Sequence, residues 1–473
     1  MIWLAVILYS VAAIGLGWYA GRVSGSADEF WTAGRRLSGV SVGLSISAGF
    51  MSVSWSCVYA VQLFYWYGLG AIWLITIPWL LTLVGIGLLA KRYHDLPSFS
   101  QPEMVGRRFG NGARRTVALA LAFVFVVWGG AEIYIAAKLL APGLGIPVPW
   151  IVVGISIIVA IYSMLGGFGA VVLTDKLQYV IVALYILAMG WLASIGMGGV
   201  EFPASEVVAA KSGASWTNPG SPGIAVIVLT FVAYLPGWLF ETDLWVRVQA
   251  ARDDRAAKQG ILIAFVSAFL FVGVLPLFIG ITALEIFPME GGSMPADIGF
   301  EGDAIFAALV GQLAPNWLSF LVAIGLVAAA MSTIDTCANV VGLSIGYDML
   351  ELQSSDRGAS RSRLVTLVAM VALCVFALNT ESLWDIFYLS GGILTTAVAF
   401  PVAAVFFSWA NPGGVRWSSG AGLTGTMVAY FLESRGLLAG VEPMWMAETG
   451  LGFIVIGGLI AVIGYAAGTL APR

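Results

Sequence analysis

The chain has 473 residues, 60% of them hydrophobic and only 10% charged, with a net charge of −4. A mean hydropathy of +0.94 excludes an ordinary water-soluble protein. The long apolar runs predict membrane helices rather than a barrel, whose strands would alternate apolar and polar residues. The three cysteines lie in apolar runs without the spacing of metal ligands, so we expect them to serve in packing.

Hydropathy and loop charge together predict thirteen transmembrane helices. They are expected at residues 2–21, 39–67, 70–90, 116–140, 149–168, 171–196, 222–246, 259–286, 316–346, 363–379, 384–409, 417–433 and 447–468. With this count the basic residues gather on one side of the membrane, and only Lys138, Lys211 and Arg435 fall on the other. The positive-inside rule then predicts a multi-pass protein of the cell membrane, with the N-terminus outside and the C-terminus in the cytoplasm. The first span lacks a preceding basic region and a cleavage site, so we expect a retained helix rather than a signal peptide.

Gly43–Ser56, with the sequence GLSISAGFMSVSWS, lies inside the second span but is rich in serine and glycine and carries no charge. Irregular backbone is tolerated at membrane depth where it lines a cavity or is buried in protein. Unwound carbonyls and hydroxyls there would suit a hard cation such as Na⁺. Close packing of two helices through small residues would explain the same composition. The stretch alone leaves both interpretations open.

The ninth span contains a stripe of polar residues on one face of the predicted helix, in the sequence MSTIDTCAN. The stripe holds Ser332, Asp335, Thr336 and Asn339, and Thr333 adjoins it. A carboxylate and several hydroxyls in one stripe indicate an ion path, because such groups are costly inside a membrane. Hydrogen bonds from the hydroxyls to their own helix would explain the serine and the threonines but not Asp335.

The seventh span holds Pro236-Gly237 at mid-depth, followed by Glu241 and Asp243. Because proline removes a hydrogen-bond donor, we expect the helix to be interrupted there. Asp243 has a candidate partner in Arg247 one turn later, whereas Glu241 has none nearby in the sequence.

Two further acidic residues lie within predicted spans. Glu132 in the fourth span has no local partner, and a pair with Lys138 across helices is one alternative. Asp175 adjoins Lys176 near the start of the sixth span, where an interfacial charge pair is the simplest interpretation.

Three motifs resemble the sodium:solute symporter family, which includes sodium/glucose, sodium/proline and sodium/sialic acid transporters. They are GRRLSG before the serine-rich span, GGFGAVVLTDKLQ at Gly166–Gln178, and AAAMSTIDTCAN in the ninth span. Weaker similarities at RVQAARDDRAAKQG and SWANPGGVRWSSGAGLTG extend the resemblance over most of residues 30–430. Any one of these matches could arise by chance, but their order along the chain is specific.

The resemblance implies an all-α membrane protein with a LeuT-type core of two inverted five-helix repeats. The sequence agrees, since the first helix of each half carries an expected break, at Gly43–Ser54 and at Pro236-Gly237. The implied division is an extra N-terminal helix and cytoplasmic loop at 1–38, a first repeat at 39–196, an external loop at 197–221, a second repeat at 222–410, and two C-terminal helices at 411–473.

The resemblance also implies a sodium site between the second and ninth spans. Its ligands here would be the backbone carbonyls of Gly43, Ile46 and Ala329 and the hydroxyls of Ser332 and Thr333. Some relatives carry a second sodium site, whose positions correspond to Asp175, Asp335 and Thr336.

The chain departs from relatives that bind sugar or proline at the expected solute pocket. Those relatives have a polar residue where Phe50 stands, and acidic Glu241 and Asp243 occupy positions that would contact a sugar. The predicted pocket consists of Phe50, Ser54, Trp55, Trp128, Glu132, Tyr234, Trp238, Glu241 and Asp243, with Tyr59 and Tyr388 nearby. Such a pocket favours an amine or a quaternary ammonium. An amino acid or a carboxylate is an open alternative, and many of these rings would also suit ordinary membrane packing.

These features predict a secondary active transporter, not an enzyme, that couples inward Na⁺ movement to uptake of a small organic solute by alternating access. We expect Na⁺ as the coupling ion, no organic cofactor, no nucleic-acid partner, and a monomer in the lipid bilayer. The sequence has no nucleotide-binding motif, which argues against a primary pump. The alternatives are a membrane sensor without useful flux and a proton-coupled symporter, the latter motivated by Glu132, Glu241 and Asp335.

Overall fold

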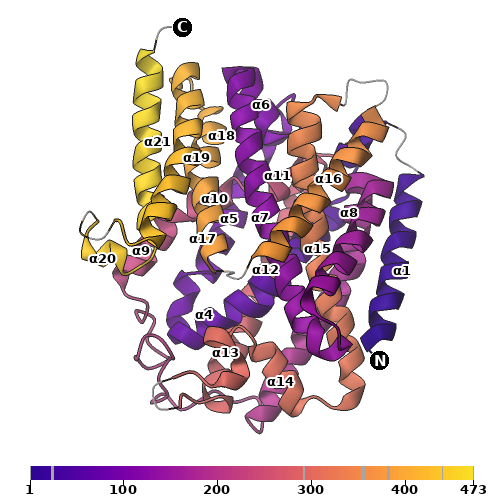
Figure 1. The fold of residues 1–473 in the computed structure, drawn as a ribbon, viewed down its shortest axis with the longest axis vertical. Coiled ribbons are helices and arrows are strands. Elements are labelled where there is room, and N and C mark those ends of the chain that lie inside the picture. Colours follow the sequence, from indigo (N-terminus) through magenta and orange to yellow (C-terminus); the bar gives the residue numbers. More distant parts are fainter. Residues whose placement is uncertain are drawn as a thin grey trace.

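The computed structural model describes residues 2–22, 26–290, 293–352, 358–380, 384–438, 440 and 442–471. Most helices run roughly along the long axis of the molecule, and α1 and α21 lie at opposite edges of it (Figure 1). Within the described part of the chain, β-pairing is limited to isolated bridges. The all-α prediction is therefore confirmed.

The helices of the first half of the chain are α1 (Ile2–Gly21), α2 (Ala27–Thr32), α3 (Gly39–Phe50), α4 (Ala60–Tyr67), α5 (Thr76–His94), α6 (Gln101–Phe109), α7 (Asn111–Leu144), α8 (Val148–Gly196), α9 (Ile224–Ala233) and α10 (Leu235–Leu239). Those of the second half are α11 (Thr242–Gln249), α12 (Asp254–Ala268), α13 (Leu275–Ile286), α14 (Ile305–Leu313), α15 (Ser319–Gly342), α16 (Gly358–Asn379), α17 (Trp384–Ile393), α18 (Phe400–Ala404), α19 (Pro412–Ser434), α20 (Met444–Ala447) and α21 (Gly452–Leu470). The described residues include four π-helical segments. Phe269–Val274 joins α12 to α13 and Leu394–Ala399 joins α17 to α18, while Val53–Tyr59 leads into α4 and Leu343–Met349 extends α15.

The described residues contain 9 helices that are long and apolar enough to cross a membrane, or 10 if one bent pair counts as a single span. α5 and α19 lie at two further expected spans, and α8 covers two expected spans at once. Within α8, Gly167 has φ 56° and ψ −146°, a conformation that only glycine adopts readily, so two helices meet there at a sharp turn. The multi-span architecture is thus confirmed, while the count of thirteen stays a prediction.

The first helix break occupies a shorter stretch of the chain than the range predicted from the sequence. α3 remains helical through Phe50, and only Met51 and Ser52 separate it from the π-helical segment Val53–Tyr59. The two parts are bent by 60° relative to each other. The observed break therefore lies inside the predicted range Gly43–Ser54, toward its C-terminal end, and the free carbonyls are those at the end of α3.

The second expected break also exists, but its proline and glycine lie inside a short helix. Pro236 and Gly237 belong to α10, which is separated from α9 by Tyr234 and from α11 by Phe240 and Glu241. Pro236 stands in the first turn of α10, where its missing N–H is no loss. The break is thus a double interruption on either side of the predicted position.

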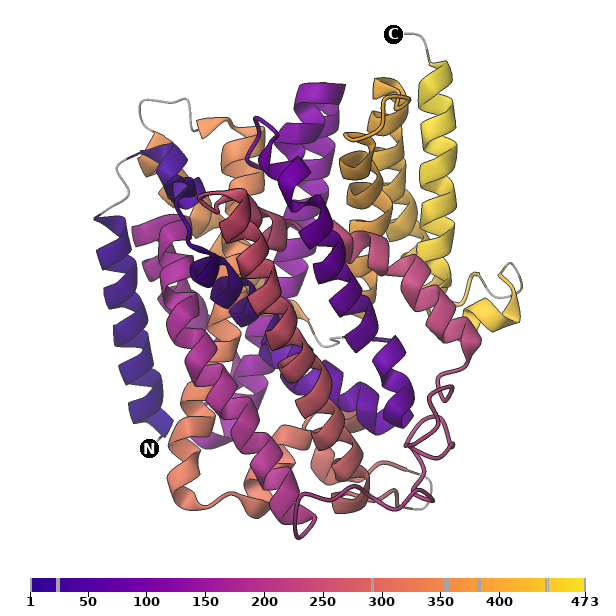
Figure 2. The ribbon, with the colours of Figure 1, turned by 180° about the vertical axis from the view of Figure 1, so that it is seen from behind.

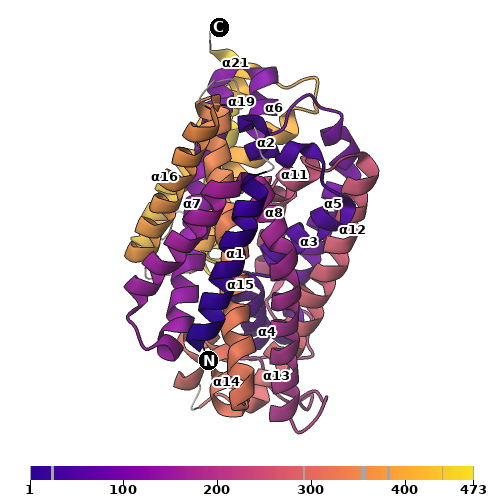
Figure 3. The ribbon, with the colours of Figure 1, turned by 90° about the vertical axis from the view of Figure 1, so that its right-hand side faces the viewer.

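The peripheral helices pack through glycines. α1 lies against α8 and α15 (Figure 3), and a Cβ at Gly21 would stand 2.2 Å from the carbonyl oxygen of Leu165. α19 and α21 pair along their lengths, and a Cβ at Gly413 would stand 2.4 Å from the carbonyl oxygen of Gly468. Only small residues allow backbones to approach this closely, as is common between membrane helices.

The segments that follow α8 and α13 cover one end of the molecule, the lower end in Figures 1 and 2. The N–H of Ala210 donates to the carbonyl of Tyr65 at 3.0 Å, and the side-chain amide of Gln62 donates to the carbonyl of Glu301 at 2.6 Å. Lys211 forms an ion pair with Glu301 at 2.8 Å. Both segments therefore close over the C-terminal end of α4.

Candidate functional site

The carbonyl end of the first broken helix faces α15. The hydroxyl of Ser332 donates to the carbonyl of Ala48 at 2.9 Å and to that of Ala329 at 2.9 Å. The hydroxyl of Thr333 donates to the carbonyl of Gly49 at 3.0 Å. These three carbonyls and two hydroxyls, which we call the neutral oxygen cluster, include every predicted sodium ligand from the ninth span.

The other two predicted ligands, Gly43 and Ile46, are not part of this cluster. The carbonyl of Gly43 accepts from the hydroxyl of Ser47 at 2.7 Å, and Gly43 packs against Ile263 of α12. Ile46 lies within the helical part of α3. Carbonyls become free only in the last turn of a helix, so a helix that ends at Phe50 presents Ala48 and Gly49 instead.

The N–H end of the first break is held by Glu132 from α7. This carboxylate is fully buried and accepts from the N–H of Val53 at 2.7 Å, from the N–H of Ser54 at 3.1 Å, and from the hydroxyl of Ser54. Lys138, the alternative partner for Glu132, instead pairs with Asp303 at 3.0 Å. Glu132 therefore satisfies the backbone of the broken helix and is not a free pocket carboxylate.

A cavity lies directly beside this break, and it is lined by Gly49, Phe50, Ser52, Ser54, Trp55, Trp79, Trp128, Trp238, Glu241, Thr333 and Phe387. The ring of Trp55 lies 5.7 Å from that of Trp79 and 5.4 Å from that of Trp238. Glu241, only 8% exposed, follows α10 and precedes the first turn of α11. We call this cavity the tryptophan pocket. It places one carboxylate among four indole rings, next to Thr333 of the neutral oxygen cluster.

Six predicted solute residues line the tryptophan pocket: Phe50, Ser54, Trp55, Trp128, Trp238 and Glu241. Of the other three, Glu132 is held by the backbone, Tyr234 stacks on Trp238 at 5.5 Å, and Asp243 pairs with Arg247 at 3.7 Å. Trp79 and Phe387 also line the pocket and are not among the residues predicted from the sequence. Trp79 lies in the first turn of α5, next to Pro78 and between Thr76 and Thr82, but it has no charged residue or family motif nearby that would mark it as a pocket residue.

A second polar cluster lies at the next level of the core, around Arg247 of α11. Its guanidinium donates to the hydroxyl of Thr336 at 2.6 Å and to the carboxylate of Asp175 at 3.3 Å. The hydroxyl of Ser45 accepts from Arg247 at 2.7 Å and itself donates to Asp175. The interfacial pair of Asp175 with Lys176 is therefore not what the structure shows, because Asp175 is buried and bonded to Arg247.

Asp335, the remaining residue of the expected second sodium site, has a partner of its own. The hydroxyl of Tyr162 donates to its carboxylate at 2.7 Å, and that of Thr174 lies 3.4 Å away. Of the predicted second-site residues, Asp175 and Thr336 thus share the guanidinium of Arg247. The sequence alone suggests only Asp243 as a partner of this arginine.

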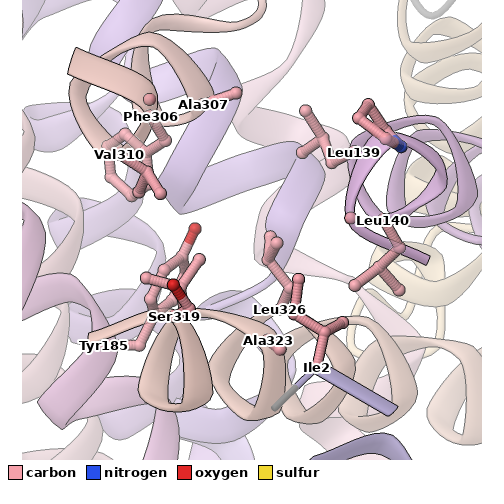
Figure 4. Close-up of a pocket in the computed structure, with 14 residues that line it drawn as sticks. Ile2, Leu139, Leu140, Tyr185, Phe306, Ala307, Val310, Ser319, Ala323 and Leu326 are labelled. Atoms are coloured by element: carbon pink, nitrogen blue, oxygen red, sulfur yellow. The ribbon is translucent and has the colours of Figure 1, made fainter. Parts of the chain in front are cut away.

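A separate apolar pocket lies near the start of α1 (Figure 4). It is lined by Ile2, Leu139, Leu140, Pro142, Gly143, Tyr185, Phe306, Ala307, Val310, Gly311, Ser319, Val322, Ala323 and Leu326. None of these lining residues carries a charge, and the pocket includes no member of the clusters described above. It therefore offers no site for an ion.

Comparisons with known proteins identify the family of this chain. The model of the sodium:solute symporter family matches residues 30–422. The chain belongs to this family. It is 26% identical to a sodium/glucose cotransporter of Vibrio parahaemolyticus over 78% of this chain and 73% of that protein. It is 31% identical to the human sodium/iodide cotransporter over 37% of this chain, a match that spans only 27% of the human protein.

The fold is that of a solved Na⁺-coupled sialic acid symporter in a substrate-bound, outward-open state. The TM-score is 0.73 at 17% sequence identity, with 100% of this chain and 98% of the other covered. The LeuT-type fold class predicted from the sequence is thereby confirmed. This member of the family is a Na⁺-coupled solute transporter rather than an enzyme, with Na⁺ as the coupling ion.

Proposed function

We propose that this protein couples inward Na⁺ movement to the uptake of a small organic cation, an amine or a quaternary ammonium, by alternating access. The observation that carries the solute class is Glu241, a carboxylate that faces the tryptophan pocket together with Trp55, Trp79 and Trp238. Indole faces attract cations through the ring quadrupole, and a carboxylate in a low-dielectric pocket adds charge attraction.

The first break supports the same solute class. In transporters of this fold, the N-terminus of a half-helix commonly points at an anionic group of the substrate, because its free N–H groups and dipole favour negative charge. Here the carboxylate of Glu132 already occupies the N–H groups of Val53 and Ser54. A solute carboxylate would have to displace a buried, hydrogen-bonded side chain, so this position disfavours an anion.

Two buried indole N–H groups suggest that the solute also carries a hydrogen-bond acceptor. In the described part of the chain, the indole N–H groups of Trp55 and Trp79 are buried without a hydrogen-bond acceptor. Buried polar groups are normally paired, and a missing partner costs free energy. A cation that also carries an acceptor oxygen would satisfy them.

For Na⁺ we propose the neutral oxygen cluster: the carbonyls of Ala48, Gly49 and Ala329 and the hydroxyls of Ser332 and Thr333. The C-terminal end of a half-helix is a common Na⁺ ligand in this fold. A hydroxyl can turn its proton away and offer a lone pair, so the cluster fits a monovalent cation. Na⁺ at this cluster would link α3 to α15. Because both helices border the tryptophan pocket there, the bound ion would also favour solute binding.

The proposal also covers the orientation of the chain in the membrane, its two repeats and its monomeric state. The first residues of α1 and the last of α21 lie toward opposite ends of the molecule (Figure 1), as the expected N-out, C-in topology in the cell membrane requires. Each proposed repeat, 39–196 and 222–410, begins with an interrupted helix. We expect the transporter to act as a monomer in the bilayer.

Uptake into proteoliposomes tests the proposal. The purified full-length chain is supplied with labelled choline, glycine betaine, an amino acid, a sugar and a monocarboxylate, with Na⁺ and pH gradients imposed separately. We expect Na⁺-driven uptake of choline in preference to the other solutes, and little response to a pH gradient. Uptake of the sugar or the monocarboxylate alone would overturn the solute class, and uptake driven by pH alone would overturn the coupling ion.

A further inference from the structure

Arg247 is one of the largest fully buried side chains, with a side chain only 1% exposed. It lies where four helices meet: its own helix α11, α3 through Ser45, α8 through Asp175 and α15 through Thr336. A fourth contact, from the guanidinium to the carbonyl of Asp243 at 3.0 Å, holds the side chain along α11. A buried charge is stable only when it is paired and hydrogen-bonded, and each nitrogen of this guanidinium has a partner.

The same place is where the expected second sodium ion would bind. Asp175 and Thr336, two of the three residues assigned to that ion, are hydrogen-bonded to the guanidinium instead. A Na⁺ bound to these two side chains would lie within a few ångströms of a fixed positive charge, and like charges at that distance repel strongly where water is excluded. The residues that surround this position therefore do not fit a second sodium ion.

We propose that the guanidinium of Arg247 is a resident cation that takes the place of a second sodium ion, so that one Na⁺ accompanies each solute. The inference rests on the sodium site proposed at the neutral oxygen cluster. Arg247 links the two broken helices, because it connects α11 to α3 directly through Ser45. An ion that binds and leaves would make this link conditional, whereas a covalently attached cation makes it permanent.

The oxygens left around Arg247 show what its removal would create. One carboxylate oxygen of Asp175 and one of Asp335 are buried without a hydrogen-bond partner among the described residues. With the guanidinium gone, the hydroxyls of Ser45 and Thr336 would also lose their charged partner. A set of carboxylate and hydroxyl oxygens without a positive charge is a donor set for a hard cation. Removing the charge should therefore add a sodium site, not merely weaken transport.

Sodium binding by the purified full-length chain tests this inference with the ion alone. Equilibrium binding of ²²Na⁺ gives the number of ions per chain, and tryptophan fluorescence titrated with NaCl gives the Hill coefficient. The wild type should bind one ion with a Hill coefficient near one. Arg247→Met, which keeps length without charge, should bind two ions, and Arg247→Lys should still bind one. The control Arg252→Met removes an arginine that is 64% exposed and should leave the number at one.

Two ions bound per wild-type chain would overturn the resident-cation proposal, and this measurement does not depend on any variant folding. A folded Arg247→Met chain that still binds one ion would overturn it as well, because charge would then not be what excludes the second ion. A wild type that binds no Na⁺ would instead overturn the sodium site at the neutral oxygen cluster. The two failures are therefore distinguishable.

Discussion

At both broken helices, side chains pair with the backbone groups that lack helical hydrogen bonds, but the side chains differ between the two. At the first break the free carbonyls of Ala48 and Gly49 meet two hydroxyls of α15, and the free N–H groups of Val53 and Ser54 meet the carboxylate of Glu132. At the second break one hydroxyl, that of Thr395, donates to the carbonyl of Ala233 and accepts from the N–H of Gly237.

This difference assigns different roles to two buried carboxylates that look alike in the sequence. Glu132 is bound by the backbone that it completes, so it stabilises the first break. Glu241 lies at the second break but faces the tryptophan pocket, because Thr395 serves the backbone there. A carboxylate that accepts hydrogen bonds from backbone N–H groups stabilises the fold, whereas a carboxylate that faces a cavity is available to a ligand. Substitutions at the two breaks should separate these roles.

The largest expected effect is on folding, for Glu132→Ala. The change leaves the buried N–H groups of Val53 and Ser54 without an acceptor, at about 1–3 kcal/mol each. The two groups together cost about 2–6 kcal/mol, which is a large share of the stability of a typical protein. We expect a strongly lowered Tm and a poor yield of monodisperse protein in detergent, with exposed Glu201→Ala as the control. A Tm like that of the wild type would contradict the structural role of Glu132.

The next effect is on sodium affinity, for Ser332→Ala combined with Thr333→Ala. Two ligands are lost, and with about 1.5 kcal/mol for each we expect a Na⁺ affinity lower by about 100-fold. The fold should survive, because hydrogen bonds of neutral side chains in membranes contribute only about 1 kcal/mol each. Titration of uptake with Na⁺ checks this. Ser418→Ala with Ser419→Ala, a buried hydroxyl pair in α19, is the matched control. An unchanged Na⁺ affinity in the first double variant would rule out the site.

A smaller effect, on solute affinity alone, is expected for Glu241→Gln. Loss of one charge-assisted contact is worth about 1.5–3 kcal/mol, or about tenfold to a hundredfold in affinity for a cationic solute. The Na⁺ affinity should change little, because Glu241 is not a member of the neutral oxygen cluster. Solute binding measured at saturating Na⁺ checks this, with exposed Glu206→Gln as the control. If affinity for every amine tested is retained, the pocket does not recognise a cation.

Much of this fold can be predicted from the sequence, because membrane helices are set by local hydropathy. Each expected span contains a described helix, and both interrupted helices lie where serine, glycine and proline collect. The place of each interruption is less predictable. α3 continues through Phe50 because nothing local stops it, and the contacts that stabilise the break come from α7 and α15, far away in the sequence.

The contacts within the candidate site are harder to predict from the sequence than the helices are. Ser332 and Thr333 can be assigned from their motif, but the carbonyls that they meet depend on where α3 ends. Arg247 lies four residues after Asp243, so a pair within one helix explains it from the sequence. Its contacts with Ser45, Asp175 and Thr336 exist only because α3, α8 and α15 converge on it. Sequence spacing carries no information on that convergence.

The smallest effect is expected for Thr395→Val, which tests whether the second break needs its single hydroxyl. Valine keeps the shape but removes one donor and one acceptor, so the carbonyl of Ala233 and the N–H of Gly237 lose a partner. The two freed groups are four residues apart and can bond each other as in a regular helix, so the net loss is about 1 kcal/mol. We therefore expect a Tm lower by a few degrees and a solute affinity lower by about fivefold. Na⁺ affinity should not change, because Thr395 touches the second broken helix and not the first. Thr424→Val, on an exposed position of α19, is the matched control. A loss of Na⁺ affinity equal to the loss of solute affinity would show that the two breaks act as one unit, and the division of roles between them would then be wrong.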